Sequence, residues 1–146
     1  MTAAAASPGG PILAERVAGT DDAVAELLAR LRAALMDHPA GRAKCDEMMM
    51  VLGEVCNNAV EHALADRSDG WVELDVSAEG ERIDVVARDD GRPMPPFLMA
   101  GRELPDMGDT VDDLPEGGFG WFIIHSLAQD MTYEREESAN RLTFSL

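Results

Sequence analysis

Hydrophobic and polar residues alternate along this chain with two periods, one typical of helices and one typical of strands. Apolar residues recur every three or four positions between Asp22 and Met36, which predicts an amphipathic helix with Thr20 or Asp21 as its cap. Apolar and polar residues alternate one by one over residues 71–77, which predicts a half-buried strand. The expected elements, in order, are a strand at 12–18, helices at 22–36 and 42–64, strands at 71–77 and 83–88, an irregular segment at 90–116, a helix to about 128, and strands at 131–136 and 141–146.

This order predicts an α+β fold, a two-layer sandwich in which helices cover one face of a mixed sheet. The chain has 146 residues, which suits one domain, and this domain is expected at 12–146 after a flexible tail at 1–11. The tail lacks the features of a secretory signal, and the apolar runs fall short of the roughly 18 residues of a membrane span. Cys45 and Cys56 are expected on one helix, about 16 Å apart at 1.5 Å per residue, which is too far for a disulfide and favours a reducing, cytoplasmic setting.

Acidic residues outnumber basic ones by 28 to 12, giving a net charge of −16. This charge argues against sequence-independent binding to nucleic acid or to anionic membranes, and it makes a basic protein partner plausible. It also repels phosphate. A nucleotide ligand would therefore need a divalent cation and backbone N–H donors.

Glu54, Asn58 and His62 follow one another at intervals of four residues in the second expected helix, so they fall along one face. Apolar residues are mixed into that face, as suits a ligand with a flat ring and a charged tail. Taken alone, the pattern is more often a solvated helix face. His62 has two open interpretations, a hydrogen-bonding residue of a site or a structural histidine near the helix end.

Two glycine-containing segments add to this face. Asp89-Asp90-Gly91 ends a strand, where a carboxylate can accept a hydrogen bond from an exocyclic amino group and the glycine lets backbone approach a planar ring. The segment 117–120, Gly-Gly-Phe-Gly, leads into a helix, and a helix start favours anions. Alone, the first suits a plain turn and the second a flexible connector.

The order of these segments makes them specific. A Glu-x-x-x-Asn helix, an Asp-x-Gly strand end, a long loop and a Gly-x-Gly helix start together resemble the Bergerat-type ATPases, which include gyrase and the histidine kinases. Within that group, the residues around Glu54–His62, Asp89–Pro93 and Gly117–Ile124 look most like bacterial anti-sigma-factor serine/threonine kinases. Pro93 stands where the broader group has a second glycine, a difference associated with the anti-sigma kinases.

The resemblance implies ATP and Mg²⁺ as ligands and a role for each matching residue. Asn58 would hold Mg²⁺, Glu54 would act as general base, and Asp89 would recognise the adenine amino group beside Gly91. The phosphates would meet the backbone of Gly118 and Gly120, under a mobile lid at about 96–116. The resemblance extends the nucleotide-binding set to Asn57, His62, Pro93, Arg102, Gly117 and Phe119.

The implied function is phosphorylation of an anti-sigma-factor antagonist on serine or threonine, combined with sequestration of a sigma factor, possible homodimerisation and no direct contact with nucleic acid. Arg102 is the single basic residue of the acidic lid, so phosphate binding should depend strongly on magnesium. The acidic lid also motivates a second hypothesis, a binding module in which ATP sets the shape of a partner surface without phosphotransfer. A detached histidine-kinase catalytic domain is the third.

Overall fold

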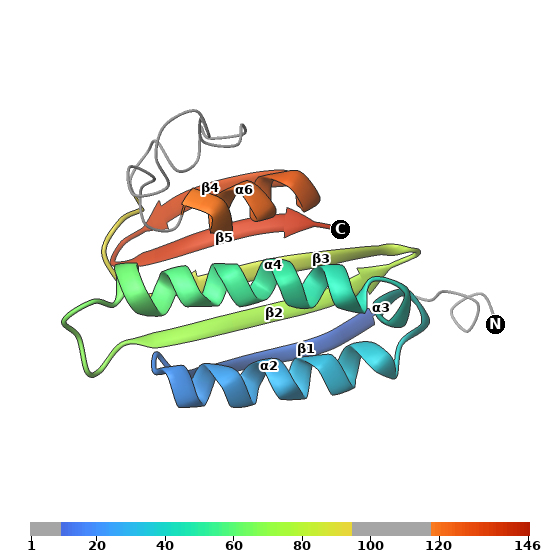
Figure 1. Ribbon diagram of the computed structural model, residues 1–146, viewed down its shortest axis with the longest axis horizontal. Helices are drawn as coiled ribbons and strands as arrows, with labels where there is room; N and C mark the ends of the chain where they lie inside the picture. The colour runs from blue at the N-terminus through green and yellow to red at the C-terminus, as the bar shows by residue number, and fades with distance from the viewer. Residues whose placement is uncertain (1–9, 95–117) are drawn as a thin grey trace.

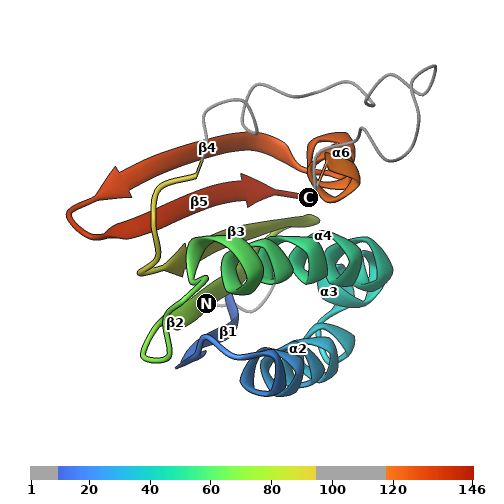
Figure 2. The same cartoon turned by 60° about the vertical axis from the view of Figure 1, so that its left-hand side comes forward.

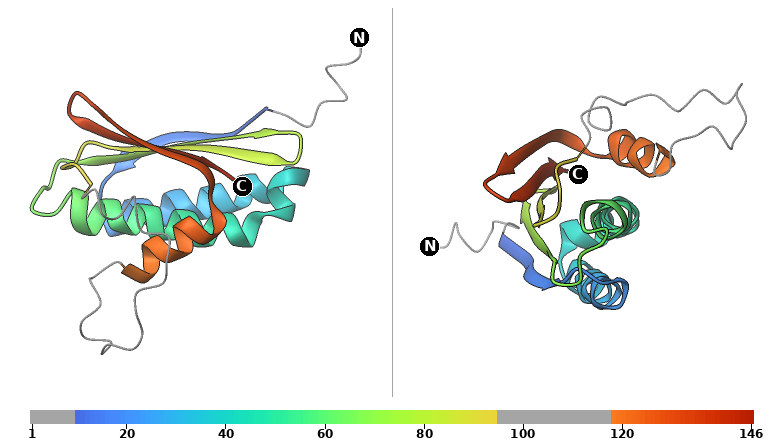
Figure 3. Two further views of the ribbon diagram at one scale, coloured as in Figure 1. Left: turned by 90° about the horizontal axis from the view of Figure 1, so that it is seen from above. Right: turned by 90° about the vertical axis from the view of Figure 1, so that its left-hand side faces the viewer.

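Residues 10–94 and 118–146 are described by the structure, a computed structural model (Figure 1). Five strands form one sheet, and helices α2, α4 and α6 lie on the same face of it (Figure 3). The elements are β1 (Gly10–Ala18), α2 (Asp21–Met36), α3 (Pro39–Ala43), α4 (Cys45–Asn58), the π-helix η1 (Ala59–Ala63), β2 (Trp71–Glu79), β3 (Arg82–Asp89), α6 (Gly118–Leu127), β4 (Gln129–Glu136) and β5 (Ala139–Ser145).

The local sequence explains where α2 begins and which face it buries. Thr20 caps the helix, and its hydroxyl oxygen accepts a hydrogen bond of 3.2 Å from the Ala23 N–H. Asp21 and Asp22 follow in the first turn, where carboxylates interact favourably with the positive end of the helix dipole. The predicted helix is confirmed, and its buried residues are Val24, Leu27, Leu31 and Leu35.

The predicted β2–β3 hairpin is also confirmed. The turn residue Gly80 has a φ of +62°, a conformation that costs glycine little. Every second residue of the two strands faces the helices, and Val76 lies opposite Val85 at the centre of the hairpin. The strands therefore contribute a continuous apolar surface, made of Val72, Leu74, Val76, Ala78, Ile83, Val85 and Ala87.

The α+β sandwich is as expected, but the expectation of a mixed sheet is wrong. All four strand pairs, in the order β1-β2-β3-β5-β4, are antiparallel. Two long helices, α2 and α4, connect β1 to β2. Because each reverses the direction of the chain, the second strand returns antiparallel to the first, whereas a single crossover helix would have made the pair parallel.

The helix expected at 42–64 divides into three parts. Pro39 starts the short helix α3, because proline suits the first helical turn. After α4, the chain widens into the π-helix η1, in which the Leu64 N–H donates to the Ala59 carbonyl at 2.8 Å. A second difference concerns the later helix α6. It begins at Gly118, so Gly118 and Gly120, which were expected to precede the helix, belong to its first turn.

The opposite face of the sheet carries a row of charged residues that runs across all five strands. Arg16, Glu73, Arg88, Arg141 and Glu134 are successive partners in the strand register. Glu73 lies within 3.1 Å of the Arg16 guanidinium and within 3.4 Å of that of Arg88. Such cross-strand pairs are typical of a sheet with one solvated face.

Two further expectations concern cysteines and membranes. Cys45 and Cys56 are both buried and free, as expected. In the described ranges, no helix has the length and apolar character needed to cross a membrane.

Two helical glycines have opposite surroundings and give a matched test of the packing. A methyl group at Gly41 would lie 2.6 Å from the Leu35 carbonyl oxygen, whereas at Gly53 it would meet no atom within 4 Å. We expect Gly41→Ala to lower the free energy of unfolding by about 1–3 kcal/mol through overpacking. Gly53→Ala should raise it by about 0.5–1 kcal/mol through helix propensity. Urea denaturation measures both, and effects of the same sign would contradict this packing.

Candidate nucleotide site

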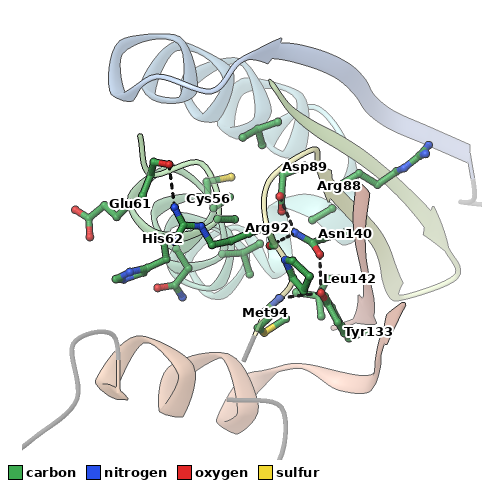
Figure 4. A pocket seen from close by; sticks show the side chains of 18 of the residues that line it. Cys56, Glu61, His62, Arg88, Asp89, Arg92, Met94, Tyr133, Asn140 and Leu142 are labelled. Carbon is green, nitrogen blue, oxygen red and sulfur yellow. Dashed lines mark hydrogen bonds between the residues drawn. The ribbon is translucent and has the colours of Figure 1, made fainter. Parts of the chain in front are cut away.

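A cavity of about 310 Å³ opens between the end of α4, η1 and the sheet (Figure 4). Its floor is apolar, made by Val72, Ala87 and Leu142 from three neighbouring strands. Trp121 of α6 forms another part of the wall. A cavity of this size with an apolar lining and a few polar groups is typical of a small-molecule site.

Asp89 is the carboxylate of this cavity, and it lies at the end of β3. Its Oδ1 accepts hydrogen bonds from the Gly91 N–H at 2.8 Å and from the Asn140 side-chain amide at 2.9 Å. Burial raises the pKa of Asp89 above its usual value, and these two hydrogen bonds oppose that rise. The carboxylate is therefore poorly solvated and is held by neutral donors.

A short polar network surrounds this carboxylate (Figure 4). The Asn140 amide also donates to the Arg92 carbonyl at 2.8 Å, and its oxygen accepts from the Tyr133 hydroxyl at 2.5 Å and from the Arg135 guanidinium at 3.0 Å. The Tyr133 hydroxyl in turn accepts from the Met94 N–H at 2.9 Å. Strands β4 and β5 thus hold the chain that follows β3.

Asn58 and His62 line the same cavity from the helix side. The Asn58 side-chain nitrogen is buried, and no described residue provides a hydrogen-bond partner for it. An unsatisfied buried amide costs about 1–3 kcal/mol. Such a group inside a cavity is therefore well suited to meet a polar ligand.

Glu54 lies on α4, one turn before Asn58, and its carboxylate is next to the first turn of α6. A methyl group built on Gly120 would overlap the Glu54 carboxylate and would lie 3.8 Å from the Asn58 side-chain nitrogen. Gly120 therefore leaves room for the Glu54 carboxylate against the first turn of α6. The contact brings the first turn of α6 beside Glu54 and Asn58, which joins two of the segments that the sequence singled out.

Gly91 joins the third segment to this assembly. A methyl group at Gly91 would overlap the Ala63 carbonyl oxygen, and the next residue, Arg92, donates its N–H to that oxygen at 2.9 Å. The chain after Asp89 is thus packed directly on the end of η1. Pro93 lines the cavity just beyond this contact.

The structure does not bring every predicted site residue to the cavity. Asn57 is exposed and lies in the groove between α2 and α4, because it is about 100° from Asn58 around the helix. Arg102, Gly117, the expected lid at 96–116 and most of the expected tail lie outside the described residues. Gly118 and Phe119 belong to the first turn of α6, and only their backbone is described.

The sequence did not single out Tyr133, Arg135 or Asn140, and it pointed to Cys56 only as a disulfide candidate and not as a site residue. The sequence pattern could have pointed to Asn140. This residue occupies a position of β5 where alternation with the buried Leu142 predicts an apolar side chain. Cys56 is fully buried in the cavity wall. Burial, followed by the nearby charge of Asp89, raises the pKa of its thiol to about 12.

Comparison with known protein families shows which family this chain belongs to. The model of the family described as histidine kinase-like ATPase domain matches residues 17–146. The chain belongs to this family. The described strands and helices are thus those of a histidine kinase-like ATPase domain.

Individual relatives of this ATPase domain are distant. It is 28% identical over 91 residues to serine-protein kinase RsbW of Bacillus velezensis, covering 59% of this chain and 54% of the relative. It is 33% identical over 86 residues to blue-light-activated histidine kinase 2 of Erythrobacter litoralis, covering 58% of this chain and 21% of the relative. The chain spans about half the length of the RsbW proteins it matches.

A solved histidine kinase domain from Erythrobacter litoralis EL346 aligns with 83% of this chain and 59% of its own, at 22% identity and a TM-score of 0.48.

A magnesium ion would find few protein ligands in the described part of this domain. Among the described residues, no three His, Cys, Asp or Glu side chains converge as a metal cluster. Mg²⁺ needs only one or two protein oxygens when phosphates and water supply the others. The Asn58 side chain lines the cavity near the Glu54 carboxylate and has one amide oxygen for that role, whereas its nitrogen, unpartnered among the described residues, can only donate a hydrogen bond.

The burial of Asp89 predicts a trade-off between stability and site chemistry. Its raised pKa means that the folded protein binds this proton more tightly than the unfolded chain, so the ionised form destabilises the fold as pH rises above about 3.9. We expect Asp89→Asn to raise the free energy of unfolding at pH 7, with a gain that shrinks as the pH falls toward that value. Denaturation without ligand at several pH values measures this.

Asp90→Asn is the matched control for that substitution. The Asp90 carboxylate pairs with Arg67 at 3.1 Å and accepts the Trp71 N–H at 2.8 Å. Its neutralisation should therefore leave stability unchanged or lower it. A destabilised Asp89→Asn protein at pH 7 would contradict the role of desolvation.

Proposed function

We propose that this chain is an Mg-ATP-dependent protein kinase that phosphorylates an anti-sigma-factor antagonist on serine or threonine and sequesters a sigma factor. The observation that carries the proposal is the contact between Glu54 and the first turn of α6, with the buried Asn58 side-chain nitrogen, which has no partner among the described residues, one turn away. The proposed base and the first turn of α6 thus lie next to Asn58, the proposed metal ligand, which lines the cavity. The names of the matched serine-protein kinases support the same reaction class.

The adenine would occupy the apolar cavity. Both hydrogen bonds that Asp89 accepts from described residues end on Oδ1, which leaves Oδ2 for the exocyclic amino group of the base. Val72, Ala87 and Leu142 offer an apolar surface to the ring. Ring burial and one directed hydrogen bond together would fix the orientation of the nucleotide.

The phosphates would extend toward the first turn of α6. Free backbone N–H groups at a helix start favour an anion, and here they adjoin Glu54 and Asn58. Magnesium would neutralise phosphate charge, with the Asn58 side-chain oxygen as the protein ligand. This neutralisation matters because the chain carries a net charge of −16.

Glu54 would complete the transfer as general base. The hydroxyl oxygen of the substrate serine or threonine attacks the γ-phosphorus, the bond from that phosphorus to the bridging oxygen breaks, and ADP leaves with the bonding electrons. The hydroxyl proton passes to the Glu54 carboxylate. Phosphoryl transfer depends chiefly on positioning and charge stabilisation, so one well-placed carboxylate is sufficient.

Substitution of Glu54 separates binding from chemistry. Glu54→Gln should keep Mg-ATP affinity within about threefold but lower phosphotransfer by about 10²–10⁴-fold, because the base is removed and the shape of the side chain is kept. Titration calorimetry and a phosphotransfer assay measure the two effects. Glu47→Gln is the matched control, since Glu47 is an exposed carboxylate in the first turn of the same helix. Full activity of Glu54→Gln would remove the residue from the catalytic role.

The alternatives require a different readout. ATP binding is first measured with and without Mg²⁺, and labelled ATP is then incubated with the protein encoded next to this one. Transfer that yields an acid-stable product supports the proposal. An acid-labile, base-stable product would favour a histidine kinase, the class named for one relative. Tight nucleotide-dependent association without transfer would indicate the binding module.

A further inference from the structure

Asn140 is a buried polar residue whose hydrogen bonds all lie within the protein. Its exposed fraction is 5%, and it shares the helix-facing side of β5 with Leu142 and Phe144. Its nitrogen donates to Asp89 Oδ1 and to the Arg92 carbonyl, and its oxygen accepts from two side chains of β4. The amide is therefore fully occupied, and none of its groups is left for a ligand.

The two ends of the amide cannot exchange places. Arg135 has only donors, so it requires the amide oxygen, and the Arg92 carbonyl has only acceptor sites, so it requires the amide nitrogen. This fixes the nitrogen on the side of Asp89. The carboxylate thus receives an N–H donor from Asn140 in addition to the N–H of Gly91.

We propose that Asn140 is a specificity-determining residue that keeps Asp89 a hydrogen-bond acceptor, so that the cavity selects a purine with an exocyclic amino group over one with a keto group. This inference rests on the proposed binding of ATP. An ionised Asp89 accepts from an amino group and repels a carbonyl oxygen. A protonated Asp89 would donate to that carbonyl oxygen and lose the discrimination.

Several groups around Asp89 set the balance between these two forms. Burial and the neighbouring carboxylate of Asp90 favour the protonated form and raise the pKa of Asp89. The donors on Asn140 and Gly91 and the charge of Arg135 lower it. The other ionisable residues around the cavity are Cys56 of α4, Glu61 and His62 of η1, Arg88 of β3, Arg92 of the following segment, and Tyr133 of β4.

The same network fixes the backbone beside the base. Arg135 donates to the Gly91 carbonyl at 2.6 Å, and Tyr133 accepts from the Met94 N–H at 2.9 Å. These contacts position the chain that lines the cavity after Asp89. Asn140 is thus a positioning residue, and its effect should appear in the choice of base and in the pH dependence of that choice.

The test compares ATP with inosine triphosphate, which has a keto group in place of the amino group, between pH 5.5 and 8.5. The wild-type protein should prefer ATP, and its preference should be smallest at the acid end. Asn140→Leu keeps a similar volume but removes the donor. At pH 7.5 its preference for ATP should fall about tenfold, the effect of one charge-assisted hydrogen bond, and the pH at which discrimination is lost should move upward.

Two further variants make the test independent of core packing. Arg135→Gln changes an exposed side chain and removes a charge that favours ionised Asp89, so it should shift the same pH profile in the same direction if Asn140→Leu does not fold. Arg141→Gln is the matched control. Arg141 follows Asn140 on β5 and points to the opposite face of the sheet, so its loss should leave base selectivity unchanged.

The possible outcomes separate this inference from the proposed function. If the wild-type protein binds neither nucleotide, the proposed function fails. If it binds ATP, but Asn140→Leu and Arg135→Gln weaken both nucleotides equally at every pH, Asn140 is only structural and the inference is overturned. Unchanged selectivity in both variants overturns it as well.

Discussion

The packing of α4 against the helix-facing side of the sheet is the constraint on which the site depends. Met48, Val51, Leu52 and Cys56 are buried along one side of this helix, and their burial fixes its rotation about its own axis. Neighbouring positions on the helix are about 100° apart. Once the apolar side faces the sheet, Glu54 must face α6, which lies beside α4 in Figure 2. The polar chemistry of this helix is thus positioned by its hydrophobic residues.

The same packing creates the need for a polar network. When α4 and η1 pack beside the end of β3, they shield Asp89 from part of the solvent, and a partly desolvated carboxylate destabilises the fold unless donors reach it. The Gly91 N–H and the Asn140 amide provide those donors, from the next turn and from β5. Strand β5, which is distant in sequence, is therefore needed to stabilise the Asp89 carboxylate at the end of β3. Stability and ligand recognition place opposite demands on this residue.

Close backbone contact explains the two glycines that join the motifs. At Gly91 a side chain would overlap the Ala63 carbonyl, and at Gly120 it would overlap the Glu54 carboxylate. The two positions differ in consequence, because a carbonyl of the main chain cannot move aside and the end of a glutamate can. Substitution of Gly91 should disturb the fold around the cavity, while substitution of Gly120 should displace Glu54. The lack of a side chain at these two glycines therefore lets the three segments of the motif pack against one another.

The sequence by itself determined the main elements, the order of the three motifs and the family, because hydrophobic periodicity and motif spacing are local properties. It placed Asn58 and Asp89 on a helix and at a strand end, where the structure has them. It could not give the antiparallel direction of every strand pair or the start of the π-helix, which depend on how the helices return across the sheet. It also missed Asn140, since only tertiary packing turns a polar residue of the last strand into the partner of a half-buried carboxylate 51 positions earlier.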